Sequence, residues 1–333
     1  MTHKFGIELP HTVDEALEID RVTGTNFWKK GIKKELSRVK AAWEARKDLT
    51  PQDIANGKDL VRYIKITCHM IFDVKMDFTR KAPLVAGGNL TEAPTRVTYS
   101  SVVSWDSVRL AFMLAALNGL AVVGCDIGNA YLNAPCREKV WFLGGSEAGE
   151  DKGKVLVITQ ALYGLKSSGA SWKSILVSTL RTMGFEDMRA DPDVWRREAN
   201  KTDGTPYYEL LLVYVDDILA VVHQLDETIK AIGAVYKIKE GSDGPPTTYL
   251  GAQVYKHNLP NGSSAWGMSS EKYVKNAVRT VQDLLEKDDR PKHHLKTTAN
   301  VPFPTSYKPE LDFSRELSED MLSRYRQLIG ILR

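Results

Sequence analysis

The segment Leu210–Val222 constrains the fold of this chain most, because two apolar arms flank the adjacent carboxylates Asp216 and Asp217. Arms of this composition predict two β-strands, and we expect a hairpin that turns at the two aspartates. Asp-Asp is a poor turn, since two-residue hairpins need positive φ values that glycine adopts more easily. Neighbouring carboxylates also repel each other unless a cation lies between them. The segment alone leaves two interpretations open, a metal site and a solvated turn whose aspartates cap their own backbone.

Length and composition indicate an ordinary globular protein. A chain of 333 residues can bury more than one core, and 43% apolar with 26% charged residues excludes a disordered or fibrous chain. The net charge of +3 is too small to indicate nucleic-acid binding by itself. The longest apolar stretch, residues 108–124, contains Arg109 and Asn118, so we do not expect a membrane span. The N-terminus lacks the pattern of a signal peptide.

The three cysteines, Cys68, Cys125 and Cys136, have neither CxxC spacing nor an even count. We therefore expect reduced thiols in an intracellular protein.

The N-terminal part is expected to begin with a basic amphipathic helix, followed by a linker at residues 51–58. Its apolar face would hold Trp28, Ile32, Leu36, Val39 and Trp43. Its lysines are consistent with contact to a phosphate backbone or simply with a solvated face. Residues 62–75 alternate apolar and polar side chains, which predicts a strand or hairpin with one buried face.

A helix is expected over residues 104–119, followed by a buried strand at residues 121–125 that ends at Asp126. The residues at core spacing in this helix are Leu110, Met113, Leu114 and Leu117. A lone aspartate after a strand is usually a turn or cap residue. Phosphoryl transfer by two metal ions needs carboxylates close together, and Asp126 with Asp216 and Asp217 would supply that set if the fold joined them.

Further elements are expected on both sides of the hairpin. Residues 155–158 predict a strand, and a helix that ends at Met183 before Gly184 should bury Trp172. Later elements are a helix at 226–236, a loop at 241–246, a hairpin around Pro260–Gly262, a helix from Ser270, a linker at 301–309 and a last helix after Ser318.

Five blocks occur in an order typical of one protein family. They are Asp126–Asn133, Ala161–Lys166, Ala190–Trp195, Leu212–Leu219 and Tyr249–Gly251. Together they resemble the reverse transcriptase of copia-type retrotransposons. The resemblance covers nearly the whole chain and is most specific from Cys68 to Gly251.

This resemblance implies an α+β, right-hand polymerase fold. The palm would be an antiparallel sheet backed by helices 106–118 and 171–183, with fingers before it and a partial thumb after it. The implied organisation is an N-terminal helical segment at 1–58, then fingers and palm with the active site at 59–240. A primer-grip hairpin and thumb-like helix would occupy 241–296, and a truncated connection region 297–333.

The resemblance also implies an active site. Asp126, Asp216 and Asp217 match the family's catalytic carboxylates, which would hold two Mg²⁺ ions, with Mn²⁺ as an alternative. Tyr131 matches the aromatic residue that disfavours a 2′-hydroxyl, although ordinary core packing is the other interpretation of this ring.

Other matches concern the substrates. Lys81, with Arg80 beside it, matches the basic fingers residue that meets the incoming triphosphate. Gly164 and Lys166 match the block that lines the nucleotide and template side. Tyr214, Leu250 and Gly251 match residues that contact or position the primer.

Some residues depart from the family pattern. Pro83 stands where relatives carry an arginine, which removes a candidate triphosphate contact and a strand N–H. Trp105 precedes Asp106, where relatives usually carry Arg, and Ser167–Gly169 replaces the commoner Gln-Ala-Pro. A relic that keeps the fold and binds nucleic acid is therefore the alternative function, and a nucleotide cyclase on a similar palm is a third.

The implied activity is DNA synthesis on an RNA or DNA template. The implied partners are a template-primer, deoxynucleoside triphosphates, and other polyprotein domains, with integrase upstream and ribonuclease H downstream; no membrane is expected. The resemblance implies cytoplasmic virus-like particles, with the nucleus as an alternative location.

Overall fold

The computed structural model describes residues 3–4, 6–60, 62–75, 78–91, 98–260, 262–286 and 315–332. It divides into two compact units, Met1–Pro245 and Pro246–Arg333, which are treated separately below. Within these described ranges, no helix combines the length and apolarity needed to cross a membrane.

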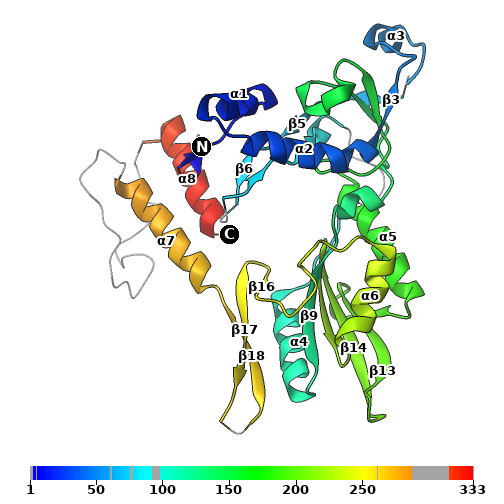
Figure 1. The fold of residues 1–333 in the computed structure, drawn as a ribbon, viewed down its shortest axis with the longest axis vertical. Helices are drawn as coiled ribbons and strands as arrows, with labels where there is room; N and C mark the ends of the chain where they lie inside the picture. The colour runs from blue at the N-terminus through cyan, green and yellow to red at the C-terminus, as the bar shows by residue number, and fades with distance from the viewer. Residues whose placement is uncertain are drawn as a thin grey trace. The chain divides into compact units, whose positions relative to one another are not determined.

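The first unit contains a five-stranded sheet in which every neighbouring pair is antiparallel, in the order β12-β13-β14-β15-β9 (Figure 1). Its strands are β9 (Ala121–Asp126), β12 (Glu186–Asp187), β13 (Val194–Asn200), β14 (Pro206–Tyr214) and β15 (Asp217–Val222). The strand that was expected before Asp126 is therefore confirmed, and it lies beside the strand that begins at Asp217.

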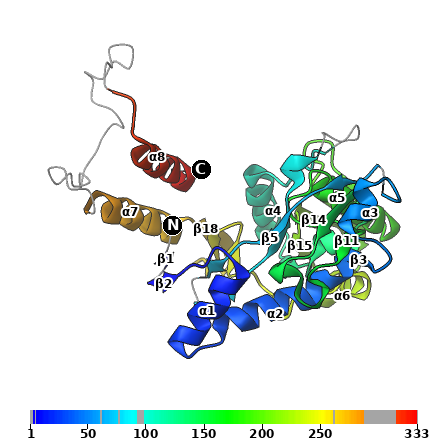
Figure 2. The same ribbon diagram turned by 90° about the horizontal axis from the view of Figure 1, so that it is seen from above.

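Helices cover both faces of this sheet. Figures 1 and 2 show α4 (Trp105–Leu117) on one face, with α5 (Ser168–Thr182) and α6 (Leu225–Val235) on the other. The face under α5 and α6 forms an apolar core that contains buried side chains from β9, β14 and β15. A layer of helix on each side keeps the sheet dry, so side chains at the ends of its strands are the ones that meet solvent.

Helix α5 buries Trp172, Leu176 and Leu180, which follow one another at four-residue spacing. It stops at Gly184, whose φ of 84° is easily adopted only by glycine. The amides of Gly184 and Phe185 donate to the carbonyls of Arg181 and Leu180, both at 3.0 Å. The predicted helix and its glycine stop are confirmed.

The predicted core face of α4 is wrong. Leu110, Met113, Leu114 and Leu117 are 40–74% exposed, whereas the side chains that pack on the sheet are Val108, Ala111, Phe112 and Ala115. The helix is apolar nearly all round, so periodicity could not select its buried face. The small alanines let the helix backbone approach the sheet closely, which the leucines would prevent.

The N-terminal part begins with α1 (Val13–Thr23), which the sequence did not predict, and α2 (Phe27–Val39). The predicted apolar face of α2 is confirmed at Trp28, Ile32 and Val39, but Trp43 lies buried at the start of strand β3 (Trp43–Arg46). The predicted linker at 51–58 is also wrong, because helix α3 (Pro51–Ala55) forms there. Thr50 and Asp53 cap its N-terminus reciprocally, a signature visible in the sequence.

Short strands complete this part of the first unit. A four-stranded sheet has the order β3-β11-β10-β4, and two small hairpins pair β5 with β8 and β6 with β7. The bounds are β4 (Ile64–Lys65), β5 (Cys68–Met70), β6 (Asp73–Val74), β7 (Arg80–Lys81), β8 (Leu84–Ala86), β10 (Val140–Leu143) and β11 (Val155–Ile158). The predicted alternation is confirmed from Ile66 to Val74, where the apolar side chains are buried, but it spans separate short strands, and Ile64, expected on the same buried face, is 37% exposed. A hairpin of β1 (His3–Lys4) and β2 (Ile7–Glu8) precedes α1.

The second unit contains a three-stranded antiparallel sheet and two helices. Its elements are β16 (Thr248–Tyr249), β17 (Ala252–Asn258), β18 (Ser264–Ser269), α7 (Glu271–Glu286) and α8 (Glu319–Leu332). The predicted β17–β18 hairpin and both helices are confirmed. The residue at the tip of that hairpin, Asn261, and the predicted linker at 301–309 lie outside the described residues.

Two glycine backbones meet where the loop before α5 crosses the end of β8. A Cβ built on Gly88 would lie 2.1 Å from the carbonyl oxygen of Gly164, and one on Gly164 would lie 2.1 Å from the carbonyl oxygen of Ala86. The amide of Ala86 donates to the carbonyl of Tyr163 at 2.8 Å. This contact joins the β5–β8 hairpin to the loop through backbone atoms alone, so neither position has room for a side chain.

We expect Gly164→Ala to destabilise the chain more than Gly204→Ala, measured as the free energy of unfolding in urea. Both glycines have positive φ, 92° and 84°, but a Cβ on Gly204 meets nothing within 4 Å. The Gly204 variant therefore measures backbone strain alone, about 1–2 kcal/mol. The Gly164 variant adds a collision with backbone, about 1–3 kcal/mol more. Equal losses in the two variants would contradict the close approach.

Candidate active site

The turn between β14 and β15 consists of Val215 and Asp216, because Tyr214 pairs directly with Asp217. The predicted turn at Asp216 and Asp217 is thus wrong by one residue, and Asp217 is the first residue of a strand. Val215 adopts a φ of 58°, which is strained for a β-branched side chain. The indole N–H of Trp172 donates to the Val215 carbonyl at 2.7 Å and holds the turn against α5.

The register of β9 against β15 brings Asp126 to the same place. Asp126 is the cross-strand partner of Asp217, and the amide of Ile127 donates to the carbonyl of Asp216 at 2.8 Å. Directly opposed residues in an antiparallel pair have Cβ atoms about 5 Å apart. The fold therefore brings Asp126 to the same end of the sheet as Asp216 and Asp217, although Asp126 lies 90 residues before Asp216 in the sequence.

Burial and mutual repulsion raise the pKa values of two of these carboxyl groups. Loss of solvent and the charges of Asp216 and Asp126 raise the pKa of Asp217 to about 6. Loss of solvent is also the main cause that raises the pKa of Asp216, with Asp126 adding to it, while the charges of Lys239 and Lys81 lower it. The site is therefore short of positive charge, and a cation placed among the carboxylates would relieve the repulsion.

Lys239 supplies part of that charge. The segment after α6 runs beside the end of β9, since the Lys239 amide donates to the Asp126 carbonyl at 2.9 Å and the Gly128 amide to the Lys237 carbonyl at 2.8 Å. This pairing directs the Lys239 ammonium onto a carboxylate oxygen of Asp126 in an ion pair. The hydroxyl of Ser242 accepts from the Asp126 amide at 3.0 Å and fixes the same segment.

The donor set suits a divalent ion such as Mg²⁺ in chemistry, because carboxylate oxygens are its preferred ligands. Burial first, and then the charges of neighbouring aspartates, raise the pKa values of Asp216 and Asp217, and a bound cation would favour their charged forms. Within the described ranges, no group of three or more acidic, histidine or cysteine side chains is placed so that it could hold a metal ion. Mg²⁺ commonly binds only one or two carboxylates together with substrate phosphates.

Two tyrosines lie beside the carboxylates. The ring of Tyr131 packs edge-on against Tyr163, with centroids 4.7 Å apart. Burial and then the charge of Asp216 raise the pKa of Tyr131, and the same two causes raise that of Tyr163. Tyr131 is thus electrostatically coupled to the carboxylate site, and its ring is held by a neighbour that the sequence did not suggest.

The two basic residues of β7 differ in their surroundings. Lys81 is exposed, and its charge contributes to lowering the pKa of Asp216. The Arg80 guanidinium lies over the rings of Phe27 and Trp28, at 5.1 and 5.7 Å, and donates to the Phe78 carbonyl. The Arg80 guanidinium is therefore already engaged by the N-terminal part of this unit.

Pro83 lies between β7 and β8 and belongs to neither strand. It continues the β5–β8 register opposite Ile71, and its carbonyl accepts from the Ile71 amide at 2.9 Å. Proline has no N–H, so it cannot donate the second bond of this pair to the Ile71 carbonyl.

The remaining predicted residues occupy separate places. Lys166 is half-buried, and its ammonium donates to the carbonyl of Thr91 at 2.5 Å. Tyr214 is 37% exposed at the end of β14. Leu250 and Gly251 form the two-residue turn between β16 and β17 in the second unit, with φ values of 48° and 81°. Such positive values at both positions are typical of a tight hairpin.

Comparison with known proteins identifies the family. Residues 62–282 match the family described as reverse transcriptase (RNA-dependent DNA polymerase). The chain belongs to this reverse transcriptase family. The matched span includes all three carboxylates of the candidate site and both sides of the β14–β15 hairpin.

The relatives are retrotransposon proteins, so the copia-type resemblance is confirmed. The chain is 27% identical over 195 residues to a truncated transposon Ty1-A Gag-Pol polyprotein and to the transposon Ty1-LR2 Gag-Pol polyprotein, both from Saccharomyces cerevisiae. The match covers 58% of this chain but only 14% and 10% of those polyproteins.

The solved structures matched by this chain include a foamy viral protease-reverse transcriptase in complex with double-stranded DNA. It is 16% identical, with a TM-score of 0.36 and coverage of 71% of this chain and 40% of that one. A second foamy viral structure, in complex with an RNA/DNA hybrid, has a TM-score of 0.36 at 15% identity and covers 73% and 31%.

The sequence did not indicate three residues that contribute to the site. They are Lys239, which pairs with Asp126, Tyr163, which supports Tyr131, and Trp172 through its hydrogen bond to Val215. Trp172 was predicted only as a core residue. A lone lysine after a helix carries no local signal, because its partner is set by the pairing of residues 237–239 with β9.

We expect Asp217→Asn to stabilise the metal-free chain near pH 7, because the folded pKa of Asp217, about 6, exceeds its ordinary value of 3.8. The proton bound by the folded state is stabilising at low pH, and this contribution is lost as the pH rises from about 4 to about 6. The melting temperature of the variant in a chelator should exceed that of the wild type at about pH 7.5 and match it at about pH 4.

Glu186→Gln is the matched control, since Glu186 is 78% exposed and lies 3.9 Å from Arg196. Its neutralisation should leave the melting temperature nearly unchanged at both pH values. A destabilised Asp217→Asn chain near pH 7 would show that the carboxylates are not in repulsion.

Proposed function

We propose that this chain is the polymerase part of a retrotransposon reverse transcriptase and extends a DNA primer on an RNA or DNA template. The observation that carries this proposal is the cross-strand pairing of Asp126 with Asp217, which places Asp216 beside them in a member of the reverse transcriptase family. A nucleotidyl transfer needs adjacent carboxylates at a solvent-facing strand end, and this pairing supplies them.

Asp126, Asp216 and Asp217 would hold two Mg²⁺ ions. When bound, such ions lower the pKa of the primer 3′-hydroxyl and neutralise charge on the departing pyrophosphate. The chain's own contribution is to hold three negative charges in a fixed arrangement before the ions arrive. Lys239 compensates one of these charges in their absence, so it would have to release Asp126 for the carboxylate to bind metal.

The neighbouring residues would select and hold the nucleotide. Lys81 is exposed and close enough to Asp216 to lower its pKa, which suits contact with the incoming triphosphate. Tyr131, braced by Tyr163, would disfavour a 2′-hydroxyl by steric exclusion. Arg80 is engaged by aromatic rings, so we assign it the role of positioning β7 and Lys81.

Further parts of the proposal concern the rest of the molecule. Gly164 and Lys166 would fix the loop that lines the nucleotide and template side, while Tyr214 and the Leu250–Gly251 turn would contact the primer. The right-hand arrangement of fingers, palm and partial thumb is proposed with them. The relatives are Gag-Pol polyproteins, so we propose integrase and ribonuclease H as companion domains and virus-like particles inside the cell as the setting.

Primer extension tests the function directly. The chain should extend a DNA primer on an RNA template with Mg²⁺ and deoxynucleotides, and Asp216→Asn should lower the rate by about 10³-fold, because it removes several kcal/mol of charge stabilisation. Glu186→Gln, an exposed acid of the same unit, should retain the wild-type rate.

The other candidate functions give different results. A folded wild-type chain that binds template-primer without extending it would be a relic, and the polymerase proposal would be wrong. Turnover of a triphosphate without primer or template would indicate a cyclase. The ion pair of Lys239 and Asp126 is the observation that favours a relic, since it occupies a ligand oxygen.

Pro83→Arg tests the departure from the family pattern. An added guanidinium on the triphosphate should lower the KM for deoxynucleotides by about tenfold, the effect of one charge-assisted hydrogen bond. The backbone carbonyl that Ile71 uses is retained in the variant. Pro83→Ala is the control for loss of the proline ring, and equal KM values for the two variants would show that no arginine contact is missing.

A further inference from the structure

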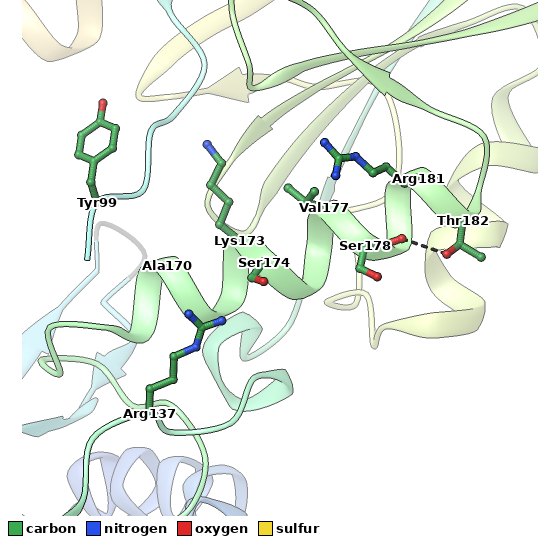
Figure 3. Close-up of a pocket in the computed structure, with 9 residues that line it drawn as sticks. All are labelled: Tyr99, Arg137, Ala170, Lys173, Ser174, Val177, Ser178, Arg181 and Thr182. Carbon is green, nitrogen blue, oxygen red and sulfur yellow. Dashed lines mark hydrogen bonds between the residues drawn. The ribbon is translucent and has the colours of Figure 1, made fainter. Parts of the chain in front are cut away.

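A groove of about 710 Å³ runs along α5, and none of the three carboxylates lines it (Figure 3). Its floor is formed by residues at helical spacing from Ala170 to Thr182, and Tyr99 and Arg137 reach it from other segments. The opposite face of the same helix carries Trp172, which supports the Val215 turn. The groove is thus built on the helix that braces the candidate active site but does not belong to that site.

Three cations line this groove, and no acidic side chain does so within the described residues. Arg137 is exposed and has no acidic partner in the described part of the chain. Arg181 pairs with Asp187 at 3.1 Å, but both side chains are exposed, and such a surface pair is weak enough to exchange. Lys173 is bound to the buried Asp193 at 2.8 Å, so it contributes little free charge.

The other lining groups suit a polar, elongated ligand. The side chains of Ser174, Ser178 and Thr182 follow one another along the helix and can donate hydrogen bonds. Tyr99 is 76% exposed at the rim, and such an aromatic ring offers a surface on which an unpaired base can stack. Cations, hydroxyls and one exposed ring in a single groove are the groups that bind single-stranded nucleic acid.

The dimensions agree with this ligand. The distance from Ala170 to Thr182, 12 residues further along the helix, is about 18 Å at the helical rise. That length corresponds to about five nucleotides of a stacked strand. We propose that the groove binds the phosphate backbone of a single-stranded stretch of nucleic acid, with Arg137 and Arg181 on phosphates and Tyr99 on a base.

This proposal rests on the proposed function, because a polymerase brings a single-stranded template to the chain. Its test needs no synthesis, so a chain that fails primer extension can still bind at the groove. Conversely, an active polymerase whose groove variants bind like the wild type would refute only the groove.

The test is fluorescence anisotropy with a labelled oligothymidylate of about 12 nucleotides, in a chelator, with the full chain. The double variant Arg137→Ser with Arg181→Ser should weaken binding roughly tenfold and reduce the salt slope by about 1.4, since each phosphate contact on a single strand contributes about 0.7. Its affinity for a blunt duplex should be unchanged.

Arg21→Ser with Arg109→Ser is the matched control, because these arginines are exposed, each pairs with one acid, and they lie on other helices. It removes the same charge and should leave oligonucleotide binding nearly unchanged. Equal weakening by both double variants would mean that bulk charge drives binding and would overturn the proposal. Unchanged binding by the groove variant would overturn it as well.

Tyr99→Ala should weaken oligothymidylate binding by about fivefold or more, while Tyr99→Phe should bind like the wild type, because stacking needs the ring and not the hydroxyl. An abasic strand of the same length should show no difference among these variants. A loss with Tyr99→Ala that persists on the abasic strand would contradict the stacking contact.

Discussion

The opposition of Asp126 and Asp217 across β9 and β15 is the constraint on which the rest of this structure depends. Like charges directly opposite in an antiparallel sheet are destabilising, so this pairing has to be imposed by the strands that carry it. Those strands are buried between α4 on one face and α5 with α6 on the other. The apolar layers fix the register, and the register forces the carboxylates together at an end of the sheet that the covering helices leave open.

Much of this sheet and its covering helices could be predicted from the sequence, because the elements follow patterns among neighbouring residues. The strand before Asp126, the two arms of the hairpin and the glycine stop of α5 each depend on patterns within a few residues, and all are confirmed. Helix α4 shows where local patterns fail, since a helix that is apolar all round has no periodicity to distinguish its buried face. The face that packs on the sheet carries Val108, Ala111, Phe112 and Ala115, and only the tertiary packing selects it over the leucine face.

The candidate site likewise contains residues that the sequence predicts and residues that it does not. Order along the chain was enough to select Asp126, Asp216 and Asp217 by resemblance, but the position of the turn was missed by one residue because Val215 adopts a conformation that valine rarely takes. Lys239 could not be found, since its contact with Asp126 depends on where the segment after α6 runs. Contacts of this kind depend on the assembled fold, so the spacing of residues along the chain does not predict them.

The strained turn at Val215 also indicates that a short segment of the chain could not hold the carboxylates in this arrangement. A β-branched residue at positive φ is unfavourable by about 1–3 kcal/mol, and a hairpin peptide of β14 and β15 would relax out of it. Trp172 stabilises the turn from a helix more than 30 residues earlier in the sequence, by about 0.5–1.5 kcal/mol. The geometry of the site is thus a property of the whole helix-and-sheet assembly, and its amides should exchange with solvent only when that assembly opens as one cooperative unit.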